Sequence, residues 1–133
     1  KYHDGLENLC NKFDKGYYPK FKKWCDEYFY LKHRNEPRGI GGIFFDYLHT
    51  DDWGKDFEFV QDVGIYFQNF VKDTLNTLKN DKWSDEDKKK QLIKRSRYAE
   101  FNLLYDRGTK FGLETGGNID AILMSMPPIA IWE

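Results

Sequence analysis

Three arginines lie beside expected turns, where a side chain can reach an anionic ligand. They are Arg34, Arg38 and Arg107. A guanidinium group carries its N–H donors in a planar fork that grips a carboxylate through two parallel hydrogen bonds. These residues therefore predict a carboxylate-binding site. The alternative is that the same arginines form surface or interdomain salt bridges.

Two histidines are candidates for metal ligation. His3 and His33 fall on different expected helices, and the chain contains neither the HxH nor the HExxH spacing of a local metal motif. A metal ion shared by these two side chains would therefore depend on tertiary contact, which local spacing does not predict.

A glycine-rich segment at residues 39–42 has the composition of a phosphate-binding loop but not its context. It precedes an expected strand instead of opening a helix, and the GxxxxGK spacing is absent. We therefore expect a tight turn at this position. No Ser/His/Asp or Cys/His pairing occurs in a motif that would predict nucleophilic catalysis.

Charge and hydropathy exclude two classes of partner. The 21 Lys and Arg residues almost balance the 22 Asp and Glu residues, so the net charge of −1 gives no general attraction to nucleic acid. Lys20–Trp24 interleaves bases and aromatics, but helical spacing directs the aromatics inward and the lysines outward. The longest apolar stretch, Ala121–Ile131, contains Ser125 and two prolines and is shorter than the ~20 residues of a membrane-spanning helix. We expect no nucleic-acid partner and no membrane span.

The two cysteines, Cys10 and Cys25, form no CxxC motif and no zinc spacing, and two are too few for a disulfide scaffold. We expect reduced, partly buried thiols in a reducing compartment. The expected localisation is the cytoplasm, and the alternative is an organelle such as a mitochondrion or plastid.

Apolar spacing predicts the elements of the first part of the chain. A short helix is expected near residues 3–13, and a second helix is expected near residues 19–31, ended by Pro37. Ile43–Leu48 is expected to be a buried strand. Thr50 or Asp51 would cap a long helix with one apolar stripe. That stripe consists of Phe57, Val60, Gly64, Phe67, Val71, Leu75 and Leu78.

The last third of the chain changes its pattern. Ser84 is expected to cap a helix, and the alternation over Tyr98–Tyr105 predicts a half-buried strand. Turns are expected at Asp106–Gly108 and Thr115–Asn118, and another strand at Ile119–Met126. Helices followed by antiparallel strands, without βαβ alternation, predict the α+β class. The missing initiator Met and the apolar last residues suggest part of a longer protein.

Two long blocks carry a specific resemblance. The first runs from residue 18 to 46 and includes YPKFKKWCDEYFY, HR and RGIGGIFFD; the second includes RYAEFNLLYDRGTKFGL at residues 97–113 and ILMSMP at residues 122–127. Together they closely resemble the oxygen-dependent coproporphyrinogen III oxidases, over nearly the whole chain. The resemblance implies that residues 1–133 are the C-terminal portion of a single domain of this family. The family's N-terminal portion, with its histidine proton donor, is absent.

The resemblance implies a fold and an activity. The fold would be an antiparallel sheet flanked by helices, incomplete in this chain. The reaction would be oxidative decarboxylation of two propionates of coproporphyrinogen III to vinyl groups, which gives protoporphyrinogen IX in heme biosynthesis with dioxygen as acceptor. No flavin, heme or nicotinamide is expected. The family forms homodimers, and Tyr98–Glu133 matches its dimer region. The alternative is an inactive tetrapyrrole-binding or dimerisation fragment of the enzyme.

The same resemblance implies roles for individual residues. Arg38 matches an arginine of the active-site cleft and would hold a propionate. Gly116, Gly117 and Asn118 match a substrate contact in which arginine is common at the third position. Asn118 can form a hydrogen bond with a carboxylate but cannot neutralise it. His3 and His33 match histidines that are described as divalent-metal ligands in bacterial members.

Overall fold

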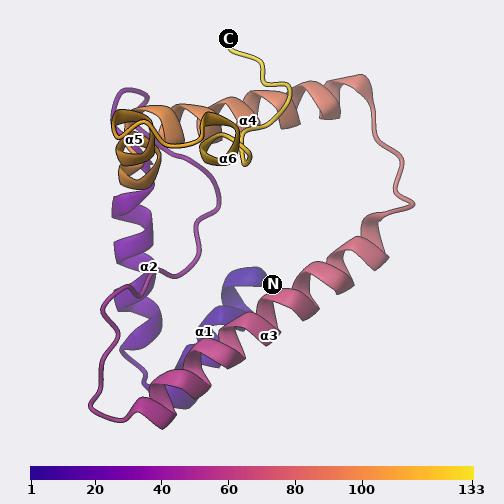
Figure 1. The fold of residues 1–133 in the computed structure, drawn as a ribbon. Coiled ribbons are helices and arrows are strands. Elements are labelled where there is room, and N and C mark those ends of the chain that lie inside the picture. The colour runs from indigo at the N-terminus through magenta and orange to yellow at the C-terminus, as the bar shows by residue number, and fades with distance from the viewer. The chain divides into compact units, whose positions relative to one another are not determined.

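The computed structural model describes residues 1–133, which divide into two units (Figure 1). Unit 1 comprises residues 1–28 and 41–82, and unit 2 comprises residues 29–40 and 83–133. Unit 1 is built from helices, whereas unit 2 combines helices with a two-stranded antiparallel sheet. The chain is therefore α+β, as expected.

Unit 1 contains α1 (Tyr2–Phe13), α2 (Tyr17–Tyr28) and α3 (Trp53–Leu78). The first two helices match the predicted ones, although α2 ends three residues early. The cap of α3 is Asp52, whose side chain accepts a hydrogen bond from the Lys55 backbone N–H at 3.0 Å. The prediction of Thr50 or Asp51 as the cap was therefore wrong by one or two positions.

The core of unit 1 joins all three helices. It consists of Leu9, Cys10, Phe21 and Phe59, and partly buried aromatic residues surround it. Figure 1 shows α1 lying alongside α3, and the Tyr66 hydroxyl of α3 donates a hydrogen bond to the Tyr2 carbonyl of α1 at 2.8 Å. This packing follows from the apolar spacing of the helices.

The predicted strand at Ile43–Leu48 is instead an irregular segment of unit 1. Its burial was predicted only in part, because Ile43, Phe45 and Leu48 are partly buried against the core, whereas Tyr47 is 90% exposed. Its backbone, however, has no strand to pair with, and Phe44 N–H donates to the Phe21 carbonyl of α2 at 3.1 Å. The apolar run at residues 43–48 therefore reflects packing against the core of unit 1, and it does not form a strand of a sheet.

Both cysteines are free and buried in unit 1. Burial raises the pKa of the Cys10 thiol to about 11. Because only the thiolate is a good nucleophile, Cys10 is unreactive at neutral pH. The prediction of buried thiols without a disulfide is confirmed.

Unit 2 begins with a short hairpin. β1 (Tyr30–Leu31) pairs antiparallel with β2 (Glu36–Pro37), and Tyr30 lies opposite Pro37. The hairpin packs on α4 (Asp85–Leu104). Two shorter helices follow, α5 (Arg107–Glu114) and α6 (Ile119–Ile122).

The predicted strands at Tyr98–Tyr105 and Ile119–Met126 were wrong, because the first lies in α4 and the second begins with α6. Ser84 and Asp87 form a capping box that starts α4. Neither glycine nor proline occurs between Ser84 and Asp106, so nothing stops the helix. Its buried residues Ser96, Ala99 and Glu100 follow helical spacing, and the apparent alternation misled the prediction.

None of these helices combines the length with the apolar character that crossing a bilayer requires.

Candidate functional site

Glu100 is the centre of a hydrogen-bonded cluster in unit 2. Arg34 donates two hydrogen bonds to its carboxylate, each at 2.5 Å, one from Nε and one from Nη2. His33 Nε2 lies 2.8 Å from Glu100 Oε2, and the Trp132 indole N–H donates to Oε1 at 2.8 Å. The helix α4 presents Glu100, the hairpin loop presents His33 and Arg34, and the C-terminal segment presents Trp132.

The cluster fixes the charge of Glu100. Its side chain is only 10% exposed, and the hydrogen bonds from Arg34, together with those from His33 and Trp132, lower the pKa of Glu100 to about 2. It is therefore ionised at neutral pH and does not act as a proton donor. The Arg34 guanidinium is held in this ion pair. Of the two interpretations of Arg34, the salt bridge is the one observed.

Arg38 has different surroundings in the same unit. Its guanidinium carbon lies 4.1 Å from the centre of the Phe29 ring, 5.0 Å from that of Phe101 and 5.1 Å from that of Tyr98. Its backbone N–H donates to the Phe29 carbonyl at 3.1 Å, which extends the hairpin by one residue. Contacts with ring faces attract a cation, whereas its N–H donors lie in the guanidinium plane. The three rings therefore fix the position of the Arg38 guanidinium. This group is half-buried, and a fixed cation of this kind favours the binding of an anion.

Tyr98 adds a polar edge to this aromatic cluster. Hydrogen bonds with the side chains of Ser125 and Asn102, and the nearby charges of Arg38 and Arg95, lower the pKa of the Tyr98 phenol. Arg95 lies 5.2 Å from the centre of the Tyr98 ring. Two guanidinium groups therefore contact one phenol ring, which gives this part of unit 2 a local positive charge.

The predicted contact at Gly116, Gly117 and Asn118 lies between α5 and α6. Gly116 has a φ of +72°, which favours glycine at a helix end. Gly117 N–H donates to the Gly112 carbonyl at 2.9 Å, and the Asn118 side-chain oxygen caps α6 by accepting from the backbone N–H groups of Asp120 and Ala121. In this conformation the Gly117 N–H and the Asn118 oxygen have partners within the chain.

The two predicted metal ligands lie in different units. His3 Nδ1 is 3.2 Å from the Tyr18 hydroxyl in unit 1. Both ring nitrogens of His33 have partners, because Nδ1 lies 2.8 Å from the Tyr105 hydroxyl and Nε2 faces Glu100. No group of three or more His, Cys, Asp or Glu side chains is arranged to hold a metal ion. The residues as placed do not fit a metal, because His33 would first have to give up a hydrogen bond.

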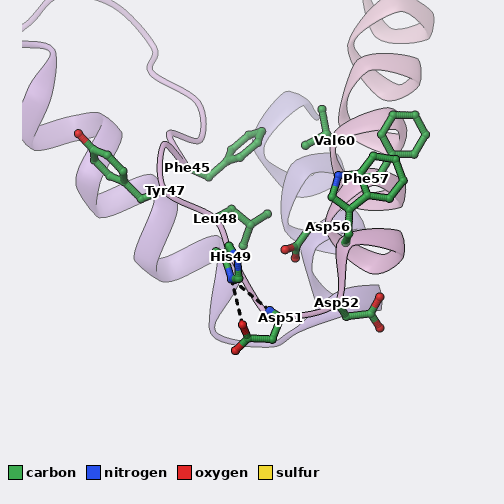
Figure 2. Close-up of a pocket in the computed structure, with 10 residues that line it drawn as sticks. Phe45, Tyr47, Leu48, His49, Asp51, Asp52, Asp56, Phe57 and Val60 are labelled. Carbon is green, nitrogen blue, oxygen red and sulfur yellow. Dashed lines mark hydrogen bonds and ion pairs between the residues drawn. The ribbon is translucent and has the colours of Figure 1, made fainter.

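A pocket of about 510 Å³ lies in unit 1, between the segment before α3 and the first turns of that helix (Figure 2). Three carboxylates line it, those of Asp51, Asp52 and Asp56, and His49 Nδ1 lies 3.5 Å from Asp51. Carboxylates repel another carboxylate, so this pocket is unsuited to the anionic ligand that the arginines predict. The remaining lining residues are Phe45, Tyr47, Leu48, Trp53, Phe57 and Val60.

The sequence interpretation missed the partners of both arginines. Glu100 was placed on the exposed face of a strand, although it is buried in a helix. The signal that could have corrected this is the uninterrupted run from Ser84 to Asp106, which predicts one helix and puts Glu100 one turn after Ser96. Nothing in the local pattern pointed to Trp132.

Comparison with known proteins gives a consistent result. The family model described as coproporphyrinogen III oxidase matches residues 1–133. A Rickettsia bellii protein named oxygen-dependent coproporphyrinogen-III oxidase is 58% identical over 132 residues, which is 99% of this chain and 47% of that protein. Proteins of the same name from Rickettsia akari and Rickettsia rickettsii are 58% and 57% identical over 128 residues, 96% of this chain and 46% of each relative.

The chain thus spans slightly less than half the length of the curated relatives that it matches. The match covers both units, and it includes the hairpin and α4, which surround Arg38. The resemblance of the two sequence blocks is confirmed over the complete chain, and the chain belongs to the coproporphyrinogen III oxidase family.

Proposed function

We propose that this chain supplies the propionate-binding part of an oxygen-dependent coproporphyrinogen III oxidase. The proposed reaction converts two propionates of coproporphyrinogen III to vinyl groups and gives protoporphyrinogen IX, with dioxygen as acceptor, in heme biosynthesis. The name of the relatives, oxygen-dependent coproporphyrinogen-III oxidase, supports the reaction. The position of Arg38 supports the part that this chain plays in it.

The proposal rests on the position of the Arg38 guanidinium. The substrate is an apolar macrocycle with four carboxylates, so its site needs a fixed cation beside aromatic surface. Arg38 provides both, because its guanidinium lies against the rings of Phe29, Tyr98 and Phe101. The guanidinium of Arg34 is bound to Glu100. In the proposed role, Arg38 orients one propionate by hydrogen bonds to its carboxylate.

The proposed chemistry balances without an organic cofactor. Each propionate that becomes a vinyl group loses carbon dioxide, one proton and two electrons. Dioxygen accepts the electrons from both conversions. The residues of this chain would bind and orient the substrate, and we assign no proton transfer to them. Glu100 in particular stays ionised and fully hydrogen-bonded at neutral pH.

A catalytically inactive fragment is the alternative. The relatives are about twice as long as this chain, and the other half supplies residues that the chain lacks. The isolated chain would then bind a tetrapyrrole or dimerise without turnover. We expect this behaviour from the 133-residue polypeptide, and oxidase activity from a complete family chain.

We also propose a homodimer contact through Tyr98–Glu133. Its support is the apolar surface of unit 2 in this range, where Leu103, Phe111, Met124 and Ile129 are each at least half exposed.

A divalent cation bound through His3 and His33 is a separate proposal, which would require His33 to leave Glu100 or Tyr105. Titration of His33→Gln with Mn²⁺ tests it, because equal binding by the wild-type chain and the variant would contradict a role for His33.

The experiment for the main proposal uses a chimera. This chain replaces the matching 132-residue span of the Rickettsia bellii relative, which is feasible at 58% identity. Protoporphyrin fluorescence is followed in air after addition of coproporphyrinogen III. The proposal predicts product from the chimera at a rate close to that of the unmodified relative, and none from the isolated chain. A folded chimera without product, beside an active relative, would contradict it.

A further inference from the structure

The helix α3 has a second apolar face that unit 1 leaves largely exposed, although its first residues Trp53, Phe57 and Val60 also line the pocket shown in Figure 2. Phe59, which is 1% exposed, packs into the core together with the partly buried Val63 and Tyr66. On another side of the helix, apolar residues recur at steps of four and three. We call this set the α3 stripe: Trp53, Phe57, Val60, Gly64, Phe67, Val71, Leu75 and Leu78.

The α3 stripe is continuous and exposed. At 3.6 residues per turn its members fall within an arc of about 80°, and they extend over ~38 Å of helix. The exposed fraction of its large side chains runs from 36% at Val71 to 77% at Trp53. Trp53 and Phe57 stack on each other with ring centres 5.1 Å apart, and no other ring covers this pair. Steps of four and three residues are typical of a helix face that packs against another element.

Gly64 lies at the middle of the α3 stripe. A Cβ atom placed there would meet nothing within 4 Å, so the glycine is not needed for packing inside unit 1. Glycine within a helix lowers helix stability, so its position is explained by a neighbour that approaches the backbone closely. That neighbour would occupy the open space in front of Gly64.

We infer that the α3 stripe docks on the half of the family's polypeptide that this chain does not contain. A helix with two apolar faces is typical of a helix held between two layers of one domain. The chain covers 47% of the Rickettsia bellii relative, so more than half of that protein is left to form the second layer. This inference rests on family membership alone and not on the proposed reaction.

A second copy of α3 is a poorer occupant. Pairing between identical helices is usually directed by complementary charges at the positions that flank the seam. Those positions are Gln61 and Gln68 on one side of the α3 stripe, and Asp56, Val63 and Phe70 on the other. The one charge among them is that of Asp56, whose carboxylate accepts two hydrogen bonds from Thr50. The α3 stripe therefore lacks the pairs of opposite charges that select a second α3.

The test compares two lysine substitutions in the chimera and in the isolated chain. Val60 belongs to the α3 stripe, and Ile65 lies outside it on the same helix; both are 50% exposed. Val60→Lys is expected to lower the Tm of the chimera by at least ~5 °C relative to Ile65→Lys. In the isolated chain, both variants are expected to unfold within ~2 °C of the wild-type Tm.

Two outcomes would overturn the inference. Equal Tm values for the two chimera variants would mean that the missing half does not cover the α3 stripe. A loss of stability from Val60→Lys in the isolated chain would mean that the α3 stripe is covered there already. Light scattering then identifies what covers the α3 stripe. If Val60→Lys converts a dimer of the isolated chain to a monomer, a second copy covers the α3 stripe; if the oligomeric state is unchanged, another part of this chain covers it.

Gly64→Ala keeps the test decisive if the lysine variant of the chimera does not fold. This change is expected to raise the Tm of the isolated chain, because alanine favours helix over glycine and has free space there. In the chimera it is expected to lower the Tm, because the new methyl group meets the docked half. A rise of the Tm in both proteins would contradict the inference.

Discussion

Glu100 and Arg38 lie in the same unit but have different surroundings. Glu100 is bound by three residues and is a buried anion, whereas the Arg38 guanidinium lies against three aromatic rings. The sequence could predict that arginines beside turns matter. It could not predict that Arg34 pairs with Glu100, because the two residues are 66 positions apart in the chain.

The pH dependence of stability follows from Glu100. Its folded pKa of about 2 lies below the ordinary value of 4.5, so its contribution to stability is present above pH 4.5 and is lost as the pH falls toward 2. The shift corresponds to ~3 kcal/mol of unfolding free energy. Glu100→Gln is expected to remove this part of the pH dependence and to destabilise the chain by ~2–4 kcal/mol at pH 7, since it leaves Arg34 without a counter-charge.

Urea unfolding between pH 2 and pH 7 measures both effects. The exposed Glu58→Gln of α3 serves as the control and should keep the wild-type slope. If Glu100→Gln unfolds with the wild-type pH profile, Glu100 is not the buried anion that the geometry describes.

Arg38→Met tests the ligand role at the same scale. Methionine keeps an unbranched side chain against the rings and removes the charge and the N–H donors. In the chimera it is expected to lower kcat/KM by about 10- to 150-fold, the equivalent of ~1.5–3 kcal/mol for a charged hydrogen bond. Lys110→Met removes one exposed charge from unit 2 and is expected to change kcat/KM less than twofold. A kcat/KM for Arg38→Met equal to that of Lys110→Met would exclude Arg38 from substrate binding.

At the scale of elements, the sequence predicted helices better than strands. The apolar spacing in α1, α2 and α3 identified these helices because their periodicity is local. Tyr98–Tyr105 was assigned to a strand because alternation over eight residues resembles one face of a sheet. The deciding features were the capping box at Ser84 and the absence of a stop signal before Asp106. Ile43–Leu48 was correctly predicted to contact the core, but this contact is partial and does not supply a partner strand.

The packing of α1 on α3 depends on Gly5. A Cβ at this position would overlap the Tyr66 ring, whose hydroxyl is held by the Tyr2 carbonyl. Gly5→Ala is therefore expected to destabilise the isolated chain by ~1–2 kcal/mol, because the cost of overpacking exceeds the gain in helix propensity. Thermal unfolding measured by circular dichroism checks the sign. A Gly5→Ala chain that is more stable than the wild type would show that Tyr66 moves aside without loss.

At the scale of the whole molecule, the chain spans slightly less than half the length of the relatives that it matches. The sequence suggested this through the resemblance, and the structure adds a physical reason in the exposed α3 stripe. The relation between the halves could not be predicted from the sequence, since an apolar stripe has the same spacing whether it faces its own core or a partner. The core of unit 1 instead uses Phe59, which the predicted stripe omitted.

The proposed oxidase function is tested most directly by the mass of the tetrapyrrole product formed by the chimera, in air and under nitrogen. In air, two propionates are expected to become vinyl groups at a rate close to that of the Rickettsia bellii relative, and no product is expected under nitrogen. Unchanged coproporphyrinogen III after incubation with a folded chimera in air, beside complete conversion by the relative, would contradict this function.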